Sequence, residues 1–154
     1  MTEPRIFQIN ASNGGVPKLP LYSATIGELG ITTDRHADMR HHGGPDRALC
    51  IYSIEQILAL QEEGHPIFPG AIGENIVTRG IDLSVLEPGN RMRLGDDVEI
   101  EITDYAPPCR TIRAAFRDED FQRASQKTNP GWSRLYTRIL AQGIISVGDA
   151  ITIL

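Results

Sequence analysis

The sequence is poor in cysteine, has no long apolar run and carries no excess of basic residues. Only Cys50 and Cys109 occur, and no Cys-x-x-Cys pair is present, so the ligand sets of iron–sulfur clusters and zinc ribbons are lacking. No apolar run approaches the roughly 18 residues of a membrane span, and the first residues contain no apolar segment typical of a secretory signal. We therefore expect a soluble, cytoplasmic protein with two free thiols and no membrane contact.

The acidic net charge of the chain bears on which classes of binding partner are expected. A formal net charge of −5 argues against a general nucleic-acid binder, which usually carries a basic face. It does not exclude a small anionic ligand, because a local basic pocket can lie inside an acidic protein. The length of 154 residues fits a single domain over residues 1–154 with its own hydrophobic core. The composition does not predict an oligomeric state.

Glycine and proline are abundant, and they favour short strands over long helices. With 15 glycines and 10 prolines, strands separated by turns should dominate. Between Val98 and Ile102, apolar and polar residues alternate, as in a strand with one wet face. We expect a mainly β fold with short helices (α+β), in which the sheet forms a closed or partly open barrel. The predicted strands are 5–10, 23–26, 48–52, 91–94, 98–102, 136–141 and 150–154.

One helix is clearly predicted, directly after strand 48–52. Ser53 is a good N-cap and Gln56 completes a capping box. Apolar residues then recur at near-helical spacing until Gly64, which should end the helix. Residues 110–125 are expected to add one or two short helices, whereas 11–20 and 27–47 are expected to be loops.

The most unusual stretch runs from Thr33 to Arg47 and contains three of the four histidines together with three arginines. His and Arg side chains donate hydrogen bonds to phosphate oxygens. Gly43 and Gly44 would let backbone N–H groups approach an anion closely. Three interpretations remain open: a solvated polar loop, an anion site, and a metal site built from the histidines His36, His41 and His42.

Cys109 is the second candidate for chemistry. It follows two prolines, which fix the backbone, and precedes Arg110, whose positive charge favours a thiolate. A rigid cysteine of this kind suits a soft metal or a sulfur-transfer step, although an inert buried thiol is about as good an interpretation. Cys50, in contrast, lies within an apolar strand and is expected to pack in the core.

Two further loops give weaker signals. Residues 13–18 combine bare glycine backbone with one cation, Lys18, which suits an anion. The triplet 73–75 could face the edge of a heterocycle through Glu74 and Asn75, or could simply cap a turn. Trp132 could stack on a ligand or pack in the core.

Taken together, these motifs resemble the MOSC family, the domain named for the C-terminal part of molybdenum cofactor sulfurases, in its stand-alone bacterial form. The resemblance runs from about residue 10 to the C-terminal end. Each motif is weak alone, but their order is specific, and the run from His42 to Arg47 is the strongest. The matching elements are Gly14-Gly15-Val16-Pro17-Lys18, His42-Gly43-Gly44-Pro45-Asp46-Arg47-Ala48, Gly73-Glu74-Asn75, Pro108-Cys109, Gly131-Trp132 and Arg138.

The resemblance implies a barrel-like fold with a pocket for the molybdenum cofactor (molybdopterin). Cys109 would be the catalytic residue and the molybdenum or sulfur ligand, and His42 and Arg47 would line the pocket. Charge and shape extend the expected cofactor contacts further. These additional residues are Lys18, Arg35, His36, Gly43, Gly44, Asp46, Glu74, Asn75 and Arg110.

The activity that the resemblance implies is a molybdenum-dependent, pyridoxal phosphate-independent reduction of small N-hydroxylated compounds. Because no second redox group is encoded, a separate electron-donating reductase would be the partner. Two alternatives remain: a carrier of the cofactor or of a persulfide, and a plain anion-binding barrel.

Two positions depart from the family pattern. Many relatives have Gly-Asp where this chain has Thr33-Asp34, and many have Arg-x-Pro-Cys where this chain has Ala106-Pro107-Pro108-Cys109. The second departure removes a cation from the surroundings of Cys109, and Arg110 is the expected replacement.

Overall fold

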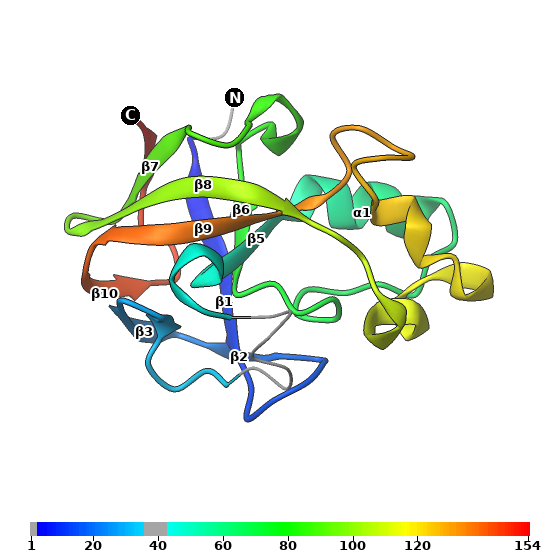
Figure 1. Ribbon diagram of the computed structural model, residues 1–154, viewed down its shortest axis with the longest axis horizontal. Coiled ribbons are helices and arrows are strands. Elements are labelled where there is room, and N and C mark those ends of the chain that lie inside the picture. The colour runs from blue at the N-terminus through cyan, green and yellow to red at the C-terminus, as the bar shows by residue number, and fades with distance from the viewer. Residues whose placement is uncertain (1–2, 36–42) are drawn as a thin grey trace.

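The computed structural model describes residues 3–35 and 43–154. Eight strands form one sheet in the order β11-β7-β8-β9-β5-β6-β1-β2, and three form a second sheet, β10-β3-β4 (Figure 1). The strands are β1 (Arg5–Ala11), β2 (Leu19–Leu21), β3 (Ser23–Gly27), β4 (Gly30–Ile31), β5 (Leu49–Ser53), β6 (Ile76–Arg79), β7 (Arg91–Leu94), β8 (Val98–Ala106), β9 (Arg134–Ala141), β10 (Gly143–Ser146) and β11 (Ile151–Ile153). The helices are α1 (Ile54–Glu62) and the short 3-10 segments η1 (Pro45–Arg47), η2 (Leu83–Val85), η3 (Arg110–Ala115), η4 (Arg117–Glu119) and η5 (Phe121–Ala124).

The mainly β fold with few short helices is therefore confirmed, but the barrel is not. The large sheet ends at β2 on one side and at β11 on the other. Arg5, the first residue of β1, forms an isolated bridge with Ala150, the residue before β11. Beside that bridge, the amide of Ile6 donates to the carbonyl of Asp149 over 2.9 Å. This contact ties β1 to the turn before β11 without making the two strands neighbours in the sheet.

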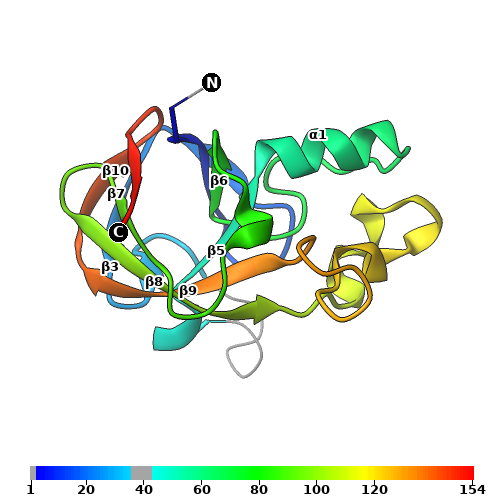
Figure 2. The ribbon, with the colours of Figure 1, turned by 90° about the horizontal axis from the view of Figure 1, so that it is seen from above.

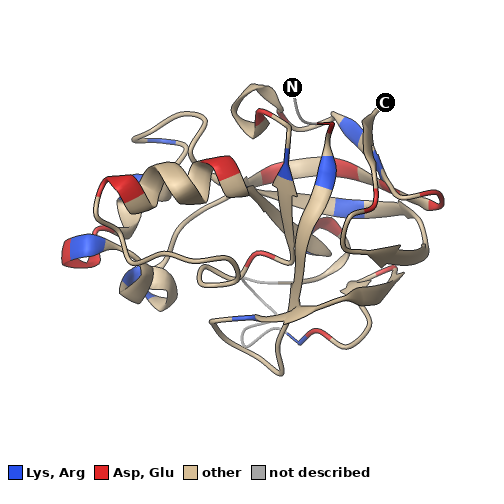
Figure 3. Ribbon diagram, turned by 180° about the vertical axis from the view of Figure 1, so that it is seen from behind, with Lys and Arg blue, Asp and Glu red and all other residues tan. Residues whose placement is uncertain are grey.

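The largest core cluster lies between the strands, and a second lies under α1. On β8, Val98, Ile100 and Ile102 are buried, whereas the residues between them are partly exposed, so the expected alternation is confirmed. On the outer face of this region, arginines and glutamates lie on neighbouring strands (Figure 3), as in the ion pair of Arg91 with Glu101 over 3.0 Å. The solvent-exposed face of the sheet thus carries ion pairs, and the buried face packs apolar side chains into the core.

The helix α1 forms as its capping residues predict. The Ser53 hydroxyl accepts a hydrogen bond from the Gln56 amide over 3.1 Å, and both halves of the capping box are present. Just past the end of the helix, Gly64 adopts a φ of 97°, a left-handed conformation that favours glycine. The helix connects β5 to β6, which pair in parallel.

Figure 2 shows α1 and the 3-10 segments of residues 110–124 together at one end of the molecule, beside the strands. No helix in the described part of the chain is long and apolar enough to cross a membrane. The pocket described next lies where this helical end meets β5, β8 and β9.

Candidate functional site

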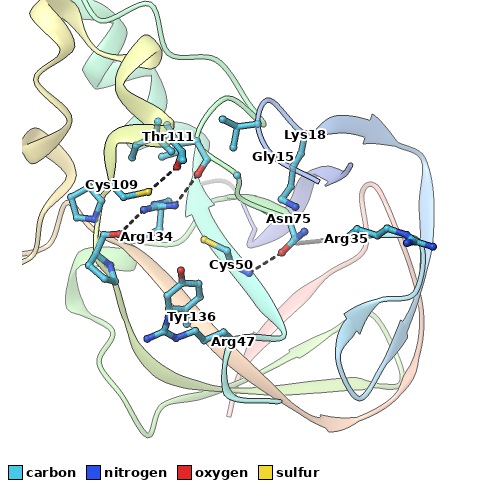
Figure 4. A pocket seen from close by; sticks show the side chains of 16 residues that line it. Gly15, Lys18, Arg35, Arg47, Cys50, Asn75, Cys109, Thr111, Arg134 and Tyr136 are labelled. Carbon is cyan, nitrogen blue, oxygen red and sulfur yellow. Dashed lines mark hydrogen bonds between the residues drawn. The ribbon is translucent and has the colours of Figure 1, made fainter. Parts of the chain in front are cut away.

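A cavity of about 430 Å³ is enclosed by residues that are far apart in the sequence (Figure 4). The residues that line it are Gly15, Val16, Lys18, Arg35, Arg47, Cys50, Ile72, Gly73, Asn75, Pro107, Pro108, Cys109, Thr111, Ile112, Arg134 and Tyr136. Cys109 lines it, and so does Cys50. The cavity is therefore the place where the two candidate segments of the sequence, the Arg-rich loop and the cysteine loop, meet.

Strand register brings the functional side chains to this cavity. Cys50 on β5 is the register partner of Tyr136 on β9, and Ala106 at the end of β8 is the partner of Arg134. Because side chains two residues apart on a strand share a face, Arg134 and Tyr136 point the same way. Three residues after Ala106, and after two prolines, the chain reaches Cys109.

The two thiols have different surroundings. Cys109 is half-buried, and its Sγ lies 2.7 Å from the Oγ1 of Thr111. Cys50 is 6% exposed. Burial raises the pKa of the Cys50 thiol to about 11, an effect that the nearby Arg134 guanidinium opposes. Cys50 is thus buried, as expected, and protonated, but it also faces the ligand cavity, which its apolar sequence context did not indicate.

Four cations line the cavity: Lys18, Arg35, Arg47 and Arg134. Within residues 3–35 and 43–154, no Asp or Glu belongs to the lining. In a chain whose formal net charge is −5, this local excess of positive charge favours an anionic ligand.

Lys18 is held by a buried ion pair. Its Nζ lies 2.8 Å from the Asp34 carboxylate, and the two side chains are 6% and 2% exposed. The same carboxylate accepts from the Asn75 side-chain amide over 2.9 Å, and the Asn75 Oδ1 accepts from the Cys50 backbone amide over 3.0 Å. One hydrogen-bonded chain therefore connects the N-terminal loop to the strand that carries Cys50.

Arg47 ends the short η1 segment and lies over the aromatic ring of Tyr136, with 5.0 Å between the guanidinium carbon and the ring centre. Burial raises the pKa of Tyr136 to about 12. The phenol consequently stays protonated at neutral pH and can donate a hydrogen bond.

Arg134 is the most deeply buried of the four cations, at 4% exposure. Its Nη1 donates to the Ile72 carbonyl over 2.8 Å. Its Nη2 donates to the Pro107 carbonyl over 3.3 Å. Its buried Nε has no hydrogen-bond partner.

The structure brings together only part of the predicted site. Lys18, Arg35, Arg47, Asn75 and Cys109 line the cavity. His36 and His42, as well as His41 of the alternative metal site, lie outside the described residues. Among the described residues, no group of three or more His, Cys, Asp or Glu could hold a metal ion by itself.

The other predicted contacts are not part of this lining. Gly44 borders a separate hollow beside β4, and Asp46 is exposed with its carboxylate 3.5 Å from Arg138. Glu74 is fully buried, accepts a hydrogen bond from the Gly70 amide over 3.0 Å, and does not belong to the lining. Burial raises the pKa of Glu74 to about 7. Gly43 and the exposed Arg110 are likewise absent from the lining.

Arg110 is the cation expected to replace the arginine that the family pattern has near Cys109. Arg110 does not line the cavity, whereas Arg134, directly opposite Ala106 in the β8–β9 pairing, does. Arg134, Tyr136 and Asp34 were not among the sequence candidates. The two-residue spacing of Arg134 and Tyr136 places a cation and a phenol on one face of a strand, but Arg138 shares this spacing, so the sequence holds no signal that singles out Arg134.

The comparisons with known proteins agree with this architecture. The family model of the MOSC domain matches residues 38–152. YiiM of Escherichia coli is 34% identical over 124 residues, which are 77% of this chain and 54% of YiiM. YflK of Bacillus subtilis is 29% identical over 142 residues, which are 91% of this chain and 63% of YflK. The chain thus spans between half and two thirds of the length of these two relatives.

A third relative carries a functional name, and a solved structure carries the same fold. A protein named reductase from Gibberella moniliformis is 31% identical over 140 residues, 88% of this chain and 24% of that protein. The crystal structure of YiiM from Geobacillus stearothermophilus superposes with a TM-score of 0.77 at 23% identity, covering 98% of this chain and 75% of that one. With the family model matching most of its length, this chain belongs to the MOSC domain family.

Proposed function

We propose that this chain binds the molybdenum cofactor in the cavity beside Cys109 and, when loaded, reduces N-hydroxylated compounds. The observation that carries the proposal is the lining itself, in which a half-buried thiol shares one cavity with four cations and no carboxylate from the described residues. A soft sulfur ligand next to cations suits a ligand that combines a sulfur-bound metal with a phosphate.

The residues present fit such a group. A cavity of about 430 Å³ lies within the range of about 300–1,000 Å³ usual for small-molecule sites. Gly15 lines it with a φ of +75°, and a Cβ at this position would meet no atom within 4 Å. The open space above this bare backbone lets a ligand approach the N-terminal loop closely.

Each lining residue has a distinct proposed task. Cys109 would ligate the metal, and Arg35 and Arg47 would bind phosphate oxygens, to which guanidinium groups donate bidentately. Lys18 is already paired with Asp34, so its task would be to add positive charge and fix the loop. His36 and His42, which lie outside the described residues, and Gly43 and Gly44 remain proposed contacts of the cofactor.

When bound, the cofactor supplies a redox centre that can take an oxygen atom from an N–O bond. Around it, the apolar side chains of Val16, Ile72 and Ile112 would exclude water. The protonated phenol of Tyr136 would offer a hydrogen bond to the substrate oxygen. Reduction of an N-hydroxy group to N–H and water consumes two electrons and two protons, and we propose that a separate reductase delivers the electrons. The relative named reductase supports an activity of this class.

The test is expression in a host that makes the cofactor, followed by metal analysis and turnover. We expect close to one molybdenum per chain and conversion of an N-hydroxylated purine or an amidoxime once a low-potential reductant is added. Protein that purifies without molybdenum from such a host would contradict the binding proposal.

A second candidate function rests on the partial exposure of Cys109. A thiol that is accessible at a cavity could carry a persulfide, or could hold the cofactor for delivery to another enzyme. Bound molybdenum without turnover on several N-hydroxylated substrates would favour this carrier function over the reductase.

A further inference from the structure

The loop between β1 and β2 contains the one asparagine of the chain that is followed by glycine, Asn13 before Gly14. Asparagine is thermolabile, and most so before glycine, whose missing Cβ leaves its backbone nitrogen free to reach the preceding side chain. The other four asparagines are followed by alanine, isoleucine, arginine and proline. A side chain on the following residue slows this attack, and proline has no N–H to take part in it. The sequence therefore singles out Asn13.

The structure leaves both reacting groups accessible. Asn13 and Gly14 are exposed, and the side-chain amide of Asn13 has no hydrogen-bond partner among the described residues. The Gly14 amide donates to the Ser12 hydroxyl over 3.3 Å, which is longer than the usual distance of about 2.9–3.0 Å. The strand pairing of Asn13 is a single isolated bridge to Arg35. The fold therefore places little restraint on a reaction between the side chain of Asn13 and the backbone nitrogen of Gly14.

The other asparagines are held by the fold or by their neighbours. Asn10 and Asn75 are buried, and the side-chain amide of each donates to a backbone carbonyl. Asn90 is half-buried, and its Oδ1 accepts from the Glu87 amide over 2.8 Å. Asn129 directly precedes a proline. The chain thus contains its own controls, because the same experiment can compare Asn13 with asparagines that are held in place.

We propose that Asn13 is a modification site, at which the chain deamidates without an enzyme, and that the modified loop weakens anion binding in the cavity. In the first step, the Gly14 nitrogen forms a bond to Cγ of Asn13, the Cγ–Nδ2 bond breaks, and ammonia leaves with the proton of the Gly14 amide. Water then opens the succinimide ring at one of its two carbonyls and gives aspartate or isoaspartate. Nothing is oxidised or reduced, and water is the sole co-reactant.

The consequence for the cavity follows from where this loop leads. Asn13 lies two positions before Gly15, which lines the cavity, and is bridged to Arg35, one of the lining cations (Figure 4). Either product carries a carboxylate that is ionised at neutral pH, which offsets part of the attraction of the cations for an anion. Isoaspartate also lengthens the main chain by one carbon atom just before Gly15. This effect rests on the anion site proposed above, whereas the modification itself stands on the loop alone.

The first arm of the test follows the chemistry by mass spectrometry. The purified protein is aged at mildly alkaline pH and digested, and a synthetic peptide of residues 11–18 gives the rate without the fold. We expect Asn13 to convert within several-fold of the peptide rate, and faster at higher pH because the Gly14 amide must lose its proton. Asn90 and Asn129 should stay unmodified. An intact Asn13 after the peptide has been converted, or equal conversion of Asn90, would overturn the site.

The second arm measures anion binding with inorganic phosphate as the probe. Phosphate that binds the folded chain raises its melting temperature, and chloride at matched ionic strength is the reference. We expect aged wild type and fresh Asn13→Asp to need several-fold more phosphate for the same rise than fresh wild type. Asn13→Gln should keep its response on ageing, because its longer side chain cyclises slowly. Asn90→Asp adds a charge outside the cavity lining and should respond like the wild type.

The outcomes of the two arms are separable. An unchanged phosphate response in aged wild type and in Asn13→Asp would overturn the effect on the cavity, and so would an equal loss in Asn90→Asp. Loss of the response in aged Asn13→Gln at the wild-type rate would show that ageing acts at another residue and would overturn it as well. If phosphate does not stabilise even the fresh wild type, the proposed anion site is contradicted, while the first arm still decides whether Asn13 is modified.

Discussion

Cys50 and Tyr136 are register partners on adjacent strands, and both line the cavity that Cys109 borders. Burial raises the pKa of the Cys50 thiol to about 11 and that of the Tyr136 phenol to about 12. Both groups therefore stay neutral at physiological pH. This part of the cavity wall contributes hydrogen-bond donors and no charge.

The two cysteines should respond differently to serine. Cys109→Ser should abolish molybdenum ligation and reductase activity but keep the fold, because the side chain is only half-buried. Cys50→Ser should keep the metal and lose about 1–3 kcal/mol of stability, the usual cost of a poorly paired buried hydroxyl. Metal content and denaturant unfolding of both variants are the measurements. A metal-loaded, active Cys109→Ser protein would remove Cys109 from the mechanism.

Removal of Arg47 should weaken cofactor retention. Arg47→Ala should weaken the binding free energy of the cofactor by about 1.5–3 kcal/mol, the scale of a hydrogen bond to a charged group. Arg47→Lys should lose less binding free energy than Arg47→Ala but still bind more weakly than the wild type, because lysine cannot donate two parallel hydrogen bonds. Retention is measured as molybdenum per chain after gel filtration. Arg91→Ala is the control, since Arg91 is exposed and paired with Glu101 on the outer face. Equal retention in all three variants would exclude Arg47 from the anion site.

The buried Glu74 should make stability depend on pH. Burial raises the pKa of Glu74 from 4.5 to about 7, so the folded state binds the proton more tightly than the unfolded chain. The resulting stabilisation is present below about pH 4.5 and is lost as the pH rises to about 7. Because Glu74→Gln cannot lose a proton, its free energy of unfolding relative to the wild type should rise by about 3 kcal/mol between these values.

Urea unfolding at a series of pH values measures this difference. Glu63→Gln should behave in the opposite sense, because the hydrogen bond from Arg123 lowers the pKa of Glu63 and its stabilisation is lost towards acid pH. A difference between Glu74→Gln and wild type that does not change with pH would show that Glu74 ionises normally in the folded protein.

Turnover should require an external electron donor. The sequence contains only two cysteines and no cluster motif that could relay electrons. Purified, molybdenum-loaded protein should form at most one product per metal, and many once a low-potential chemical reductant is present. Chromatography of the product, normalised to molybdenum, checks this. Sustained turnover without a donor would reveal an electron source within the protein.

Local sequence signals predicted seven of the eleven strands in the described residues and missed β2, β4, β6 and β10. Arg91–Leu94 and the capping residue Ser53 were readable because alternation and capping are local properties. Strand β6 was missed, since its run of buried residues after Asn75 does not alternate. Its identity as a strand comes from pairing with β5 and β1 on either side.

The sequence predicted only those site residues that lie within a recognisable motif. Arg47, Lys18 and Cys109 lie in glycine- or proline-rich loops whose composition suggests a ligand. Arg134 lies within a strand, and nothing local distinguishes a buried, cavity-lining arginine from the exposed Arg138 four residues later. Only the pairing of Arg134 with Ala106 shows which of the two faces the cavity.

The cavity walls join residues 15–18 to residues 134–136, and every wall connects segments that are distant along the chain. Contacts between distant segments form late in folding, because the entropy cost of closing a long loop comes before the favourable energy of the contacts. Nascent or refolding protein should therefore acquire α1 early and the ability to bind its ligand last. If the cavity binds the proposed cofactor, a chain whose synthesis has not yet passed residue 134 would lack part of the binding site, and loading would have to follow completion of the fold.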